Sequence, residues 1–112
     1  MDCLFCKMAA GEIPVNKVYE DEQVLAFHDI DPQAPVHFLV IPKKHLDSPA
    51  AITEQDAQLV GHMFAVIAKV AEQMGLEKGY RVVTNCSEDG GQSVQHLHFH
   101  VLAKRSLAWP PG

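Results

Sequence analysis

The amino-acid sequence predicts the α+β class, with a mostly antiparallel sheet of five strands, one long helix and a short N-terminal helix. Short segments with strand character stand before and after one long helical segment, instead of alternating with several helices. In the long segment apolar residues recur at spacings of three and four, whereas near the C-terminus they alternate with histidines. No repeat or linker divides the 112 residues, so we expect one domain over residues 1–112.

Proline and glycine mark the ends of the shorter elements. A short helix is expected over residues 4–10, because Gly11 can end it and Pro14 disfavours helix in the residue before it. Pro42 should end a central strand, since proline cannot donate to the hydrogen-bond ladder. The predicted strands are residues 17–20, 24–29, 37–41, 80–85 and 97–103.

The long helix is predicted over residues 53–74. Thr53 is a suitable N-cap, Asp56 favours the positive end of the helix, and Gly75 ends it. The apolar stripe expected to face the sheet consists of Val60, Phe64, Ile67, Ala71 and Met74.

Composition and charge exclude several classes of partner. The net charge is -5, so a basic surface for nucleic acid or for an anionic membrane is not expected. The N-terminus lacks the pattern of a secretory signal, and no apolar run approaches the roughly 18 residues of a membrane helix. We therefore expect a cytoplasmic protein. Its three cysteines then suggest metal binding or redox chemistry, because disulfides are rare in that compartment.

Three histidines, His96, His98 and His100, alternate with apolar residues near the C-terminus. In a strand they would share one face, while the apolar residues meet the long helix. A half-buried strand that carries histidine on its outer face by chance is the alternative. One metal ion cannot easily bind all three rings, because the outer two lie about 13 Å apart and each reaches only about 6 Å from its Cα. The strand should therefore divide its histidines between metal binding and chemistry.

Residues 96–102, HLHFHVL, fit the pattern His-φ-His-φ-His-φ-φ, where φ is an apolar residue. Five further segments agree with the same family, in order: AFHDI (26–30), QAP (33–35), HFLVIPKKH (37–45), GGQSV (90–94) and WPPG (109–112). The chain thus resembles the histidine triad (HIT) superfamily, in the bacterial type of its histidine triad nucleotide-binding (Hint) branch. The resemblance implies the HIT fold and a homodimer whose two sheets join. It also implies that the protein binds purine nucleotides.

The implied activity is hydrolysis of nucleoside phosphoramidates, in which AMP or GMP is linked to an amine, with some activity on aminoacyl-adenylates. The family's nucleophile is the middle histidine, here His98, which would form a nucleotidyl-histidine intermediate that water hydrolyses. One of its ring nitrogens must be held as N–H by an acceptor, often a backbone carbonyl, so that the other keeps its lone pair. His100 and His37 resemble residues that line the α-phosphate pocket, although ordinary surface histidines are the alternative. Ser93 would donate a hydrogen bond near the leaving group.

Other positions resemble the family's nucleotide-binding residues. Asp29 would accept hydrogen bonds from the ribose, and Asn85 would orient the phosphate or ribose end. Gly91 and Gln92 belong to a glycine-rich turn that lets backbone approach a phosphate, although such a pair is more often an ordinary loop.

Apolar side chains are expected around the base, with ordinary core packing as an equal alternative for each. These candidates are Leu4, Phe5, Phe27, Ile30 and Leu39. Trp109 is similar to a C-terminal tryptophan that in the family reaches toward the partner subunit's site. His28 and His62 are interpreted as structural.

Cys3 and Cys6 form a C-x-x-C pair with three interpretations: a redox centre, two unrelated buried thiols, or half of a tetrahedral zinc site. The resemblance favours a structural Zn²⁺ held by Cys3, Cys6, His45 and His96, as in many bacterial members, although eukaryotic-type Hint proteins often lack these cysteines. No organic cofactor is expected. Cys86 is interpreted as a packed or loop thiol.

Two other functions compete with the phosphoramidase. A dinucleoside polyphosphate hydrolase from another HIT branch is the first, and Ser93 and the Trp109 ending argue against it. A nucleotide-binding regulatory module with incidental catalysis is the second.

Overall fold

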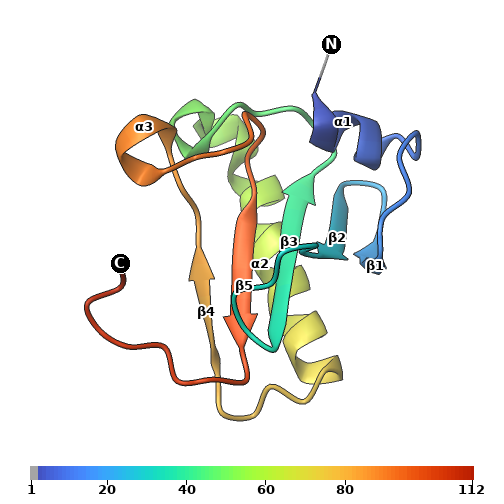
Figure 1. Ribbon diagram of the computed structural model, residues 1–112. Helices are drawn as coiled ribbons and strands as arrows, with labels where there is room; N and C mark the ends of the chain where they lie inside the picture. Colours follow the sequence, from blue (N-terminus) through green and yellow to red (C-terminus); the bar gives the residue numbers. More distant parts are fainter. Residues whose placement is uncertain (1–2) are drawn as a thin grey trace.

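A five-stranded sheet in the order β1-β2-β3-β5-β4 organises residues 3–112, the part of the chain that this computed structural model describes (Figure 1). Each strand runs antiparallel to its neighbours. The strands are β1 (Lys17–Glu20), β2 (Val24–His28), β3 (Val36–Pro42), β4 (Tyr80–Val83) and β5 (Phe99–Ala103). With the short helix α1 (Leu4–Ala9) and the long helix α2 (Ala57–Gln73), this arrangement confirms the predicted fold class.

Strands β2 and β3 are buried along almost their whole length, because both faces of the sheet are covered there. Alternate side chains enter two separate apolar clusters. The cluster against α2 contains Val24, Ala26, Phe38 and Val40. The cluster beneath α1 contains Leu25, Phe27, Leu39 and Ile41. The unbroken apolar runs in these strands are therefore explained by burial on both sides.

Helix α2 follows two short 3-10 helices, η1 (Pro49–Ala51) and η2 (Glu54–Asp56). The long helix therefore begins at Ala57, later than the predicted residue 53, because η2 occupies the first turn. Thr53 is the N-cap of η2, and its backbone N–H donates a hydrogen bond to the Asp56 carboxylate at 3.0 Å.

The stripe that faces the sheet is partly different from the predicted one. Phe64 is 46% exposed and Val60 and Met74 are only partly buried. The fully buried residues of α2 are Met63, Val66, Ile67, Val70 and Ala71. Spacings of three and four from Met63 define the buried face, which leaves Phe64 at its margin, where its ring lies 4.9 Å from that of Phe99.

The two strands near the histidines are shorter than expected. Strand β4 ends at Val83 and β5 begins at Phe99. Beyond this point the Thr84 hydroxyl donates a hydrogen bond to the His98 carbonyl oxygen at 2.9 Å, so a side chain continues the connection where the backbone ladder stops.

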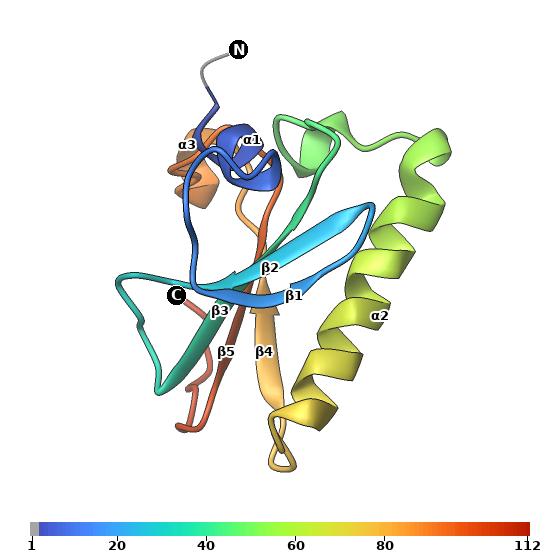
Figure 2. The ribbon, with the colours of Figure 1, turned by 90° about the vertical axis from the view of Figure 1, so that its right-hand side faces the viewer.

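Figure 2 shows α2 along one face of the sheet, with α1 and α3 (Ser87–Gly90) gathered at the end where β3 finishes and β5 begins. The sequence did not predict α3, a single turn that Gly91 ends in the left-handed region, at a φ of 77°. Among residues 3–112, no helix combines the length and apolar character needed to cross a membrane. The end of the sheet beneath α1 carries the histidines and cysteines discussed below.

Met63→Ala and Phe64→Ala form a matched pair that tests the orientation of α2. Met63→Ala should lower the free energy of unfolding by about 2 to 4 kcal/mol, because it leaves a buried cavity. Phe64→Ala should lower it by about 1 kcal/mol, because this side chain is half exposed. Urea unfolding followed by circular dichroism measures both values. Equal losses would mean that the helix presents a different face to the sheet.

Candidate functional site

A cavity of about 480 Å³ opens on the face of the sheet that α1 covers. Its walls come from α1, β2, β3 and the chain that leads into β5. The lining residues are Leu4, Phe5, Met8, Pro14, Val15, Asn16, Phe27, His28, Asp29, Ile30, Leu39, Ser93, Val94, His98 and His100. Mostly apolar walls with a few convergent polar groups are the usual form of a small-molecule site.

Most of the residues that resemble nucleotide-binding positions meet at this cavity. They are Leu4, Phe5, Phe27, Asp29, Ile30, Leu39, Ser93, His98 and His100. His28, interpreted as structural from the sequence, also lines the cavity. Met8, Val15 and Val94 were missed, because isolated apolar residues in short helices and loops carry no periodic signal.

His98 is held in one orientation by the extended segment that leads into β5. It is 3% exposed, and its Nδ1–H donates to the carbonyl oxygen of His96 at 2.7 Å. Because a carbonyl only accepts, the proton must reside on Nδ1, and Nε2 keeps its lone pair. His98 therefore presents to the cavity a ring whose free nitrogen can act as a nucleophile.

His100 is held in the opposite tautomer by a chain of hydrogen bonds. The backbone N–H of Gln33 donates to Nδ1 of His37 at 3.0 Å, so the proton of the His37 ring resides on Nε2. That N–H donates to Nδ1 of His100 at 2.9 Å. The proton of His100 therefore resides on its own Nε2, which makes His100 a hydrogen-bond donor beside the nucleophile.

Burial keeps His100 neutral. Desolvation, and then the neighbouring His98 and His37, lower its pKa to about 4. At neutral pH the ring donates a hydrogen bond without carrying a charge.

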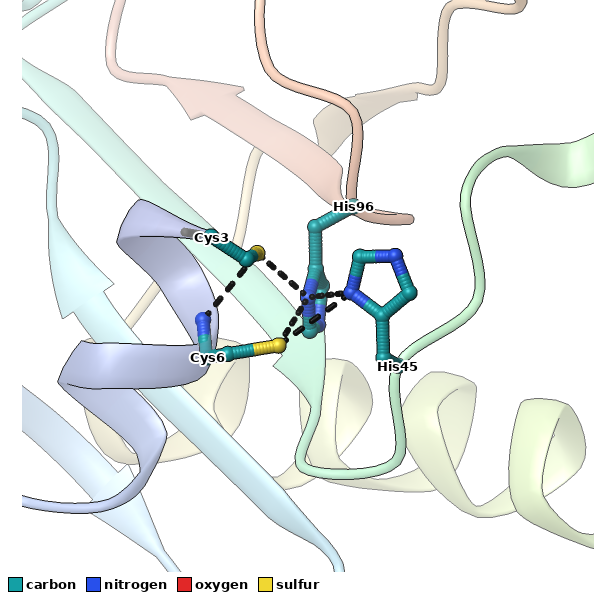
Figure 3. A group of neighbouring side chains, drawn as sticks. All are labelled: Cys3, Cys6, His45 and His96. Carbon is teal, nitrogen blue, oxygen red and sulfur yellow. Dashed lines mark hydrogen bonds between the residues drawn. The ribbon is translucent and has the colours of Figure 1, made fainter. Parts of the chain in front are cut away.

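Four side chains form a second cluster beside the cavity (Figure 3). Cys3 and Cys6 come from the start of α1, His45 follows β3, and His96 precedes β5. Their potential ligand atoms all lie within 4.8 Å of one another. The Cys3 Sγ–His96 Nδ1, Cys6 Sγ–His45 Nδ1 and Nδ1–Nδ1 distances are 3.3, 3.2 and 3.1 Å. Neighbouring ligand atoms of a tetrahedral zinc site are about 3.3 to 3.8 Å apart, and the distances in the cluster are at or slightly below this range. An outward adjustment of a few tenths of an ångström would therefore fit this ion.

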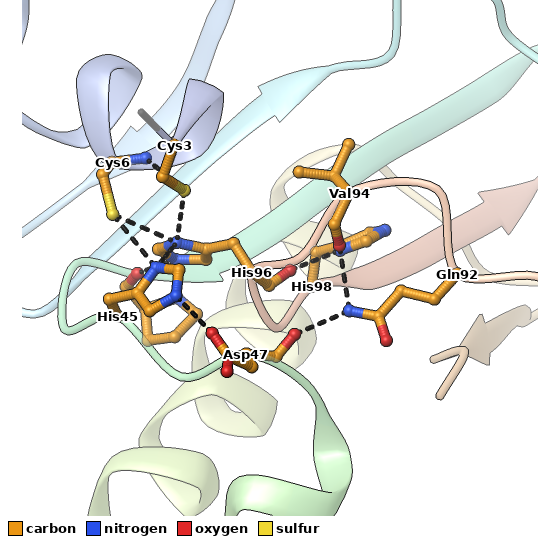
Figure 4. A network of polar contacts seen from close by, with 9 residues as sticks. Cys3, Cys6, His45, Asp47, Gln92, Val94, His96 and His98 are labelled. Carbon is orange, nitrogen blue, oxygen red and sulfur yellow. Dashed lines mark hydrogen bonds and ion pairs between the residues drawn. The ribbon is translucent and has the colours of Figure 1, made fainter. Parts of the chain in front are cut away.

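The protonation of the two rings also suits a metal. Nε2 of His96 donates to the Pro42 carbonyl at 2.7 Å, and Nε2 of His45 faces the Asp47 carboxylate at 2.6 Å (Figure 4). Both partners are acceptors, so the neutral rings direct their Nδ1 lone pairs into the cluster. Burial lowers the pKa of His96, whereas burial and Cys3 raise the pKa of Cys6 to about 11. Without a cation the Cys6 thiol keeps its proton, which a metal ion would displace.

Asp29, His37 and His100 also bring potential ligand atoms within 4.8 Å of one another. The Nε2 of His37 lies 3.4 Å from a carboxylate oxygen of Asp29. This nitrogen carries a proton, because Nδ1 already accepts from Gln33, so it cannot donate a lone pair to a metal. The group is therefore a hydrogen-bond relay, and of the two groups found among residues 3–112 the one with the cysteines has the donor atoms of a metal site.

Four residues of the expected nucleotide set lie outside the cavity lining. Both ends of the Gln92 amide are occupied: Nε2 donates to the carbonyl oxygens of Asp47 and Val94, and Oε1 accepts from the Ser87 N–H. The side chain of Gln92 therefore ties the loops around α3 together. The other three residues are Asn85, Gly91 and Trp109.

The C-terminal tail is held by Arg81, whose Nη2 donates to the carbonyl oxygens of Leu107 and Ala108 at 3.2 and 3.1 Å. Trp109 follows and is 81% exposed. A large apolar side chain in this position is available to a partner.

Two residues given structural roles from the sequence have definite contacts. Nε2 of His62 lies 2.6 Å from the carboxylate of Asp21, which joins α2 to the β1–β2 hairpin. Cys86 lies at the start of α3, where hydrogen bonds with Ser48, Ser87 and the Ala50 backbone lower its pKa. Neither side chain belongs to the cavity or to the metal-binding cluster.

Comparison with known proteins agrees with this geometry. Residues 10–107 match the HIT domain family. A HIT-like protein of Synechococcus elongatus is 50% identical over 111 residues, which cover 99% of this chain and 97% of that protein. The structure of a histidine triad protein from Clostridium difficile is 53% identical, with a TM-score of 0.94, over 96% of this chain and 95% of that one. A HIT family hydrolase from Legionella pneumophila is 48% identical, with a TM-score of 0.97, over 99% and 100% of the two chains.

The lowered pKa of His100 predicts a pH-dependent stability. The unfolded ring takes up a proton near pH 6.5, whereas the folded ring resists until about pH 4. The stabilisation that comes from this residue is therefore complete above about pH 6.5 and is lost as the pH falls toward 4. Between about pH 7 and pH 5, the free energy of unfolding should fall less in His100→Gln than in the wild type.

Chemical unfolding at the two pH values measures the difference. Phe64→Ala is the control, because it changes stability without removing a titratable group, and its fall should equal that of the wild type. An equal fall in His100→Gln and the wild type would contradict the burial of a neutral ring.

Proposed function

The chain belongs to the HIT domain family, and we propose that it hydrolyses the phosphorus–nitrogen bond of purine nucleoside phosphoramidates. Its substrates would be AMP or GMP linked to an amine, and aminoacyl-adenylates would react at the same site. The observation that carries this proposal is the pair of opposite tautomers beside one cavity, with a lone pair on His98 and an N–H on His100.

In the first step His98 Nε2 would form a bond to the α-phosphorus while the bond to the amine breaks. The Nδ1–H bond to the His96 carbonyl stabilises the ring as it becomes positively charged. The neutral N–H of His100 donates to a non-bridging oxygen of the phosphate, where negative charge is concentrated. The amine takes up a proton from the solvent as it leaves, and Ser93, which lines the cavity, can donate a hydrogen bond to the departing nitrogen.

In the second step water would attack phosphorus and release a proton to the solvent, which balances the proton taken up by the amine. The His98–phosphorus bond would break, and the nucleotide would leave with the water oxygen. His98 regains its lone pair, since Nδ1 keeps its proton throughout. The relay from Gln33 through His37 keeps His100 as a donor in both steps, because no proton has to move along it.

The rest of the cavity would bind the nucleoside. Phe5, Phe27 and Leu39 offer an apolar slot for a purine, and Phe5 and Phe27 already pack edge to face at 5.6 Å. Asp29 also lines the cavity, where its carboxylate can accept hydrogen bonds from ribose hydroxyls.

A homodimer would complete the site. Strand β4 lies at an edge of the sheet, and Ile30 and Trp109 are 101% and 81% exposed. Unpaired strand edges and exposed apolar side chains favour association with a second copy. Trp109 would then lie beside the leaving-group end of the partner's cavity.

The cluster of Cys3, Cys6, His45 and His96 would hold a structural Zn²⁺. The ion would supply a cross-link between α1 and the segments around β3 and β5, with no part in the bond changes at phosphorus. We propose no organic cofactor, because the reaction is a nucleophilic displacement that histidine can perform alone.

His98→Asn should lower kcat for an adenosine phosphoramidate by about a thousandfold or more, because it removes the nucleophile. Steady-state hydrolysis measures this, beside diadenosine polyphosphates as a competing substrate class. His62→Asn is the matched control, since that histidine lies outside the cavity, and it should keep wild-type activity. Preferred cleavage of the polyphosphates would support another HIT branch, and AMP binding without turnover would support a regulatory module.

Zinc content provides a separate test. Protein purified under reducing conditions should contain about one zinc per chain, and Cys6→Ser should reduce this value strongly, because it removes one of four ligands. Cys86→Ser should keep the full amount, since Cys86 lies outside the cluster. Elemental analysis measures the zinc content of the wild type and of both variants. A zinc content in Cys6→Ser equal to that of the wild type would contradict the assigned ligand set.

A further inference from the structure

We propose that metal binding at the cluster of Cys3, Cys6, His45 and His96 is coupled to nucleotide binding in the cavity, so that each raises the affinity for the other. The proposal rests on the proposed function, because it takes this cavity as the nucleotide site. Three connections between the two sites support it: helix α1, the ring of Phe5, and the segment from His96 to His98.

Helix α1 contributes to both sites. Cys3 and Cys6 belong to the metal-binding cluster, whereas Leu4, Phe5 and Met8 line the cavity. A helix of six residues is too short to be stable alone, so its position depends on what holds it to the sheet. An apolar cluster and the metal-binding cluster provide that attachment. A bound metal would therefore fix one wall of the cavity.

The ring of Phe5 touches both sites directly. It is 4% exposed, and its centroid lies 5.9 Å from that of His96 and 5.2 Å from that of His98, both in edge-to-face contact. A shift of His96 on metal binding would therefore be transmitted to the cavity and to the nucleophilic ring.

His96 joins the two sites through its own backbone. Its Nδ1 points into the metal-binding cluster, while its carbonyl oxygen accepts the hydrogen bond from His98 Nδ1 (Figure 4). The residue is fully buried. The atom that orients the nucleophile and the atom that would bind the metal therefore belong to one buried residue.

The two sites also share a wall. A second hollow, of about 780 Å³, is lined by Cys3 and His45 on the metal side. Leu4, Ser93 and Val94 line this hollow and the nucleotide cavity alike. A nucleotide that orders these three residues in the cavity would therefore also restrict the motion of the metal-binding cluster on their other side.

The coupling should be positive because zinc and the nucleotide would order the same segments of the protein. If zinc has already fixed α1 and the His96 segment, a nucleotide does not have to order them when it binds. By linkage, the nucleotide must raise the affinity for zinc by the same factor.

The test measures AMP affinity by calorimetry in the zinc-loaded wild type and again after a chelator has removed the zinc. We expect about tenfold weaker AMP binding without zinc. The reciprocal measurement is zinc affinity by competition with a chromophoric chelator, which should rise by the same factor at saturating AMP. AMP affinity that changes less than about twofold would overturn the coupling.

Two variants of α1 locate the connection. Phe5→Leu keeps an apolar side chain but removes the edge contacts with His96 and His98, so the ratio of the two AMP affinities should fall toward one. Met8→Leu is the matched control, because Met8 lines the cavity from the same helix and belongs to neither ring contact, so it should keep the wild-type ratio. If Phe5→Leu and Met8→Leu gave the same ratio of AMP affinities with and without zinc, the role of Phe5 would be overturned.

Hydrogen exchange separates local coupling from global unfolding. Without zinc, the amides of α1 should exchange faster while those of β2 and β3 stay protected, and loss of protection in these strands would overturn a local mechanism. Zinc-loaded protein that fails to bind AMP would overturn the proposed function as well. AMP binding that does not depend on zinc would overturn the coupling alone.

Discussion

The arrangement of both sites depends on the burial of Leu97, Phe99 and Val101 against α2. These three side chains belong to the main apolar cluster, and at most 4% of each is exposed. Because side chains alternate along an extended chain, their burial fixes the intervening histidines on the opposite face. A slip of one residue would turn the histidines into the apolar core, at a cost that the fold cannot sustain.

On that face, the hydrogen-bond partners of each ring decide what it can do. A carbonyl oxygen fixes the proton of His98 on Nδ1, while a backbone N–H, acting through His37, fixes the proton of His100 on Nε2. The same reasoning distinguishes the two clusters that pass a simple distance criterion for metal binding. The rings of His45 and His96 turn lone pairs toward each other, whereas His37 turns an N–H toward its neighbours.

Some features of the fold could be predicted from the periodicity of apolar residues and from short motifs. The alternation of the histidines, the long helix and the antiparallel class follow from patterns of two and of three to four, although only His100 of the three lies within β5. The length of an extended chain showed only that one ion cannot easily bind all three rings, and the assignment of His96 to the metal came from the resemblance. The joining of Cys3 and Cys6 with His45 and His96 came from resemblance, because contacts between distant segments leave no local signal.

Other features were out of reach for physical reasons. The relay to His100 begins at a backbone N–H of Gln33, and every residue except proline carries that group. Phe64 was assigned to the buried stripe because a helix has two neighbouring apolar rows, and only packing against the sheet selects between them. Gln92 belongs to a motif that suggests phosphate binding, yet its amide holds loops together.

The central claim is that His98 and His100 present opposite tautomers to one cavity, and nitrogen-15 NMR of the histidine rings tests it most directly. We expect a proton on Nδ1 of His98 and on Nε2 of His100, and at neutral pH an uncharged His100 ring. The same tautomer on both rings, or a positively charged His100, would contradict it.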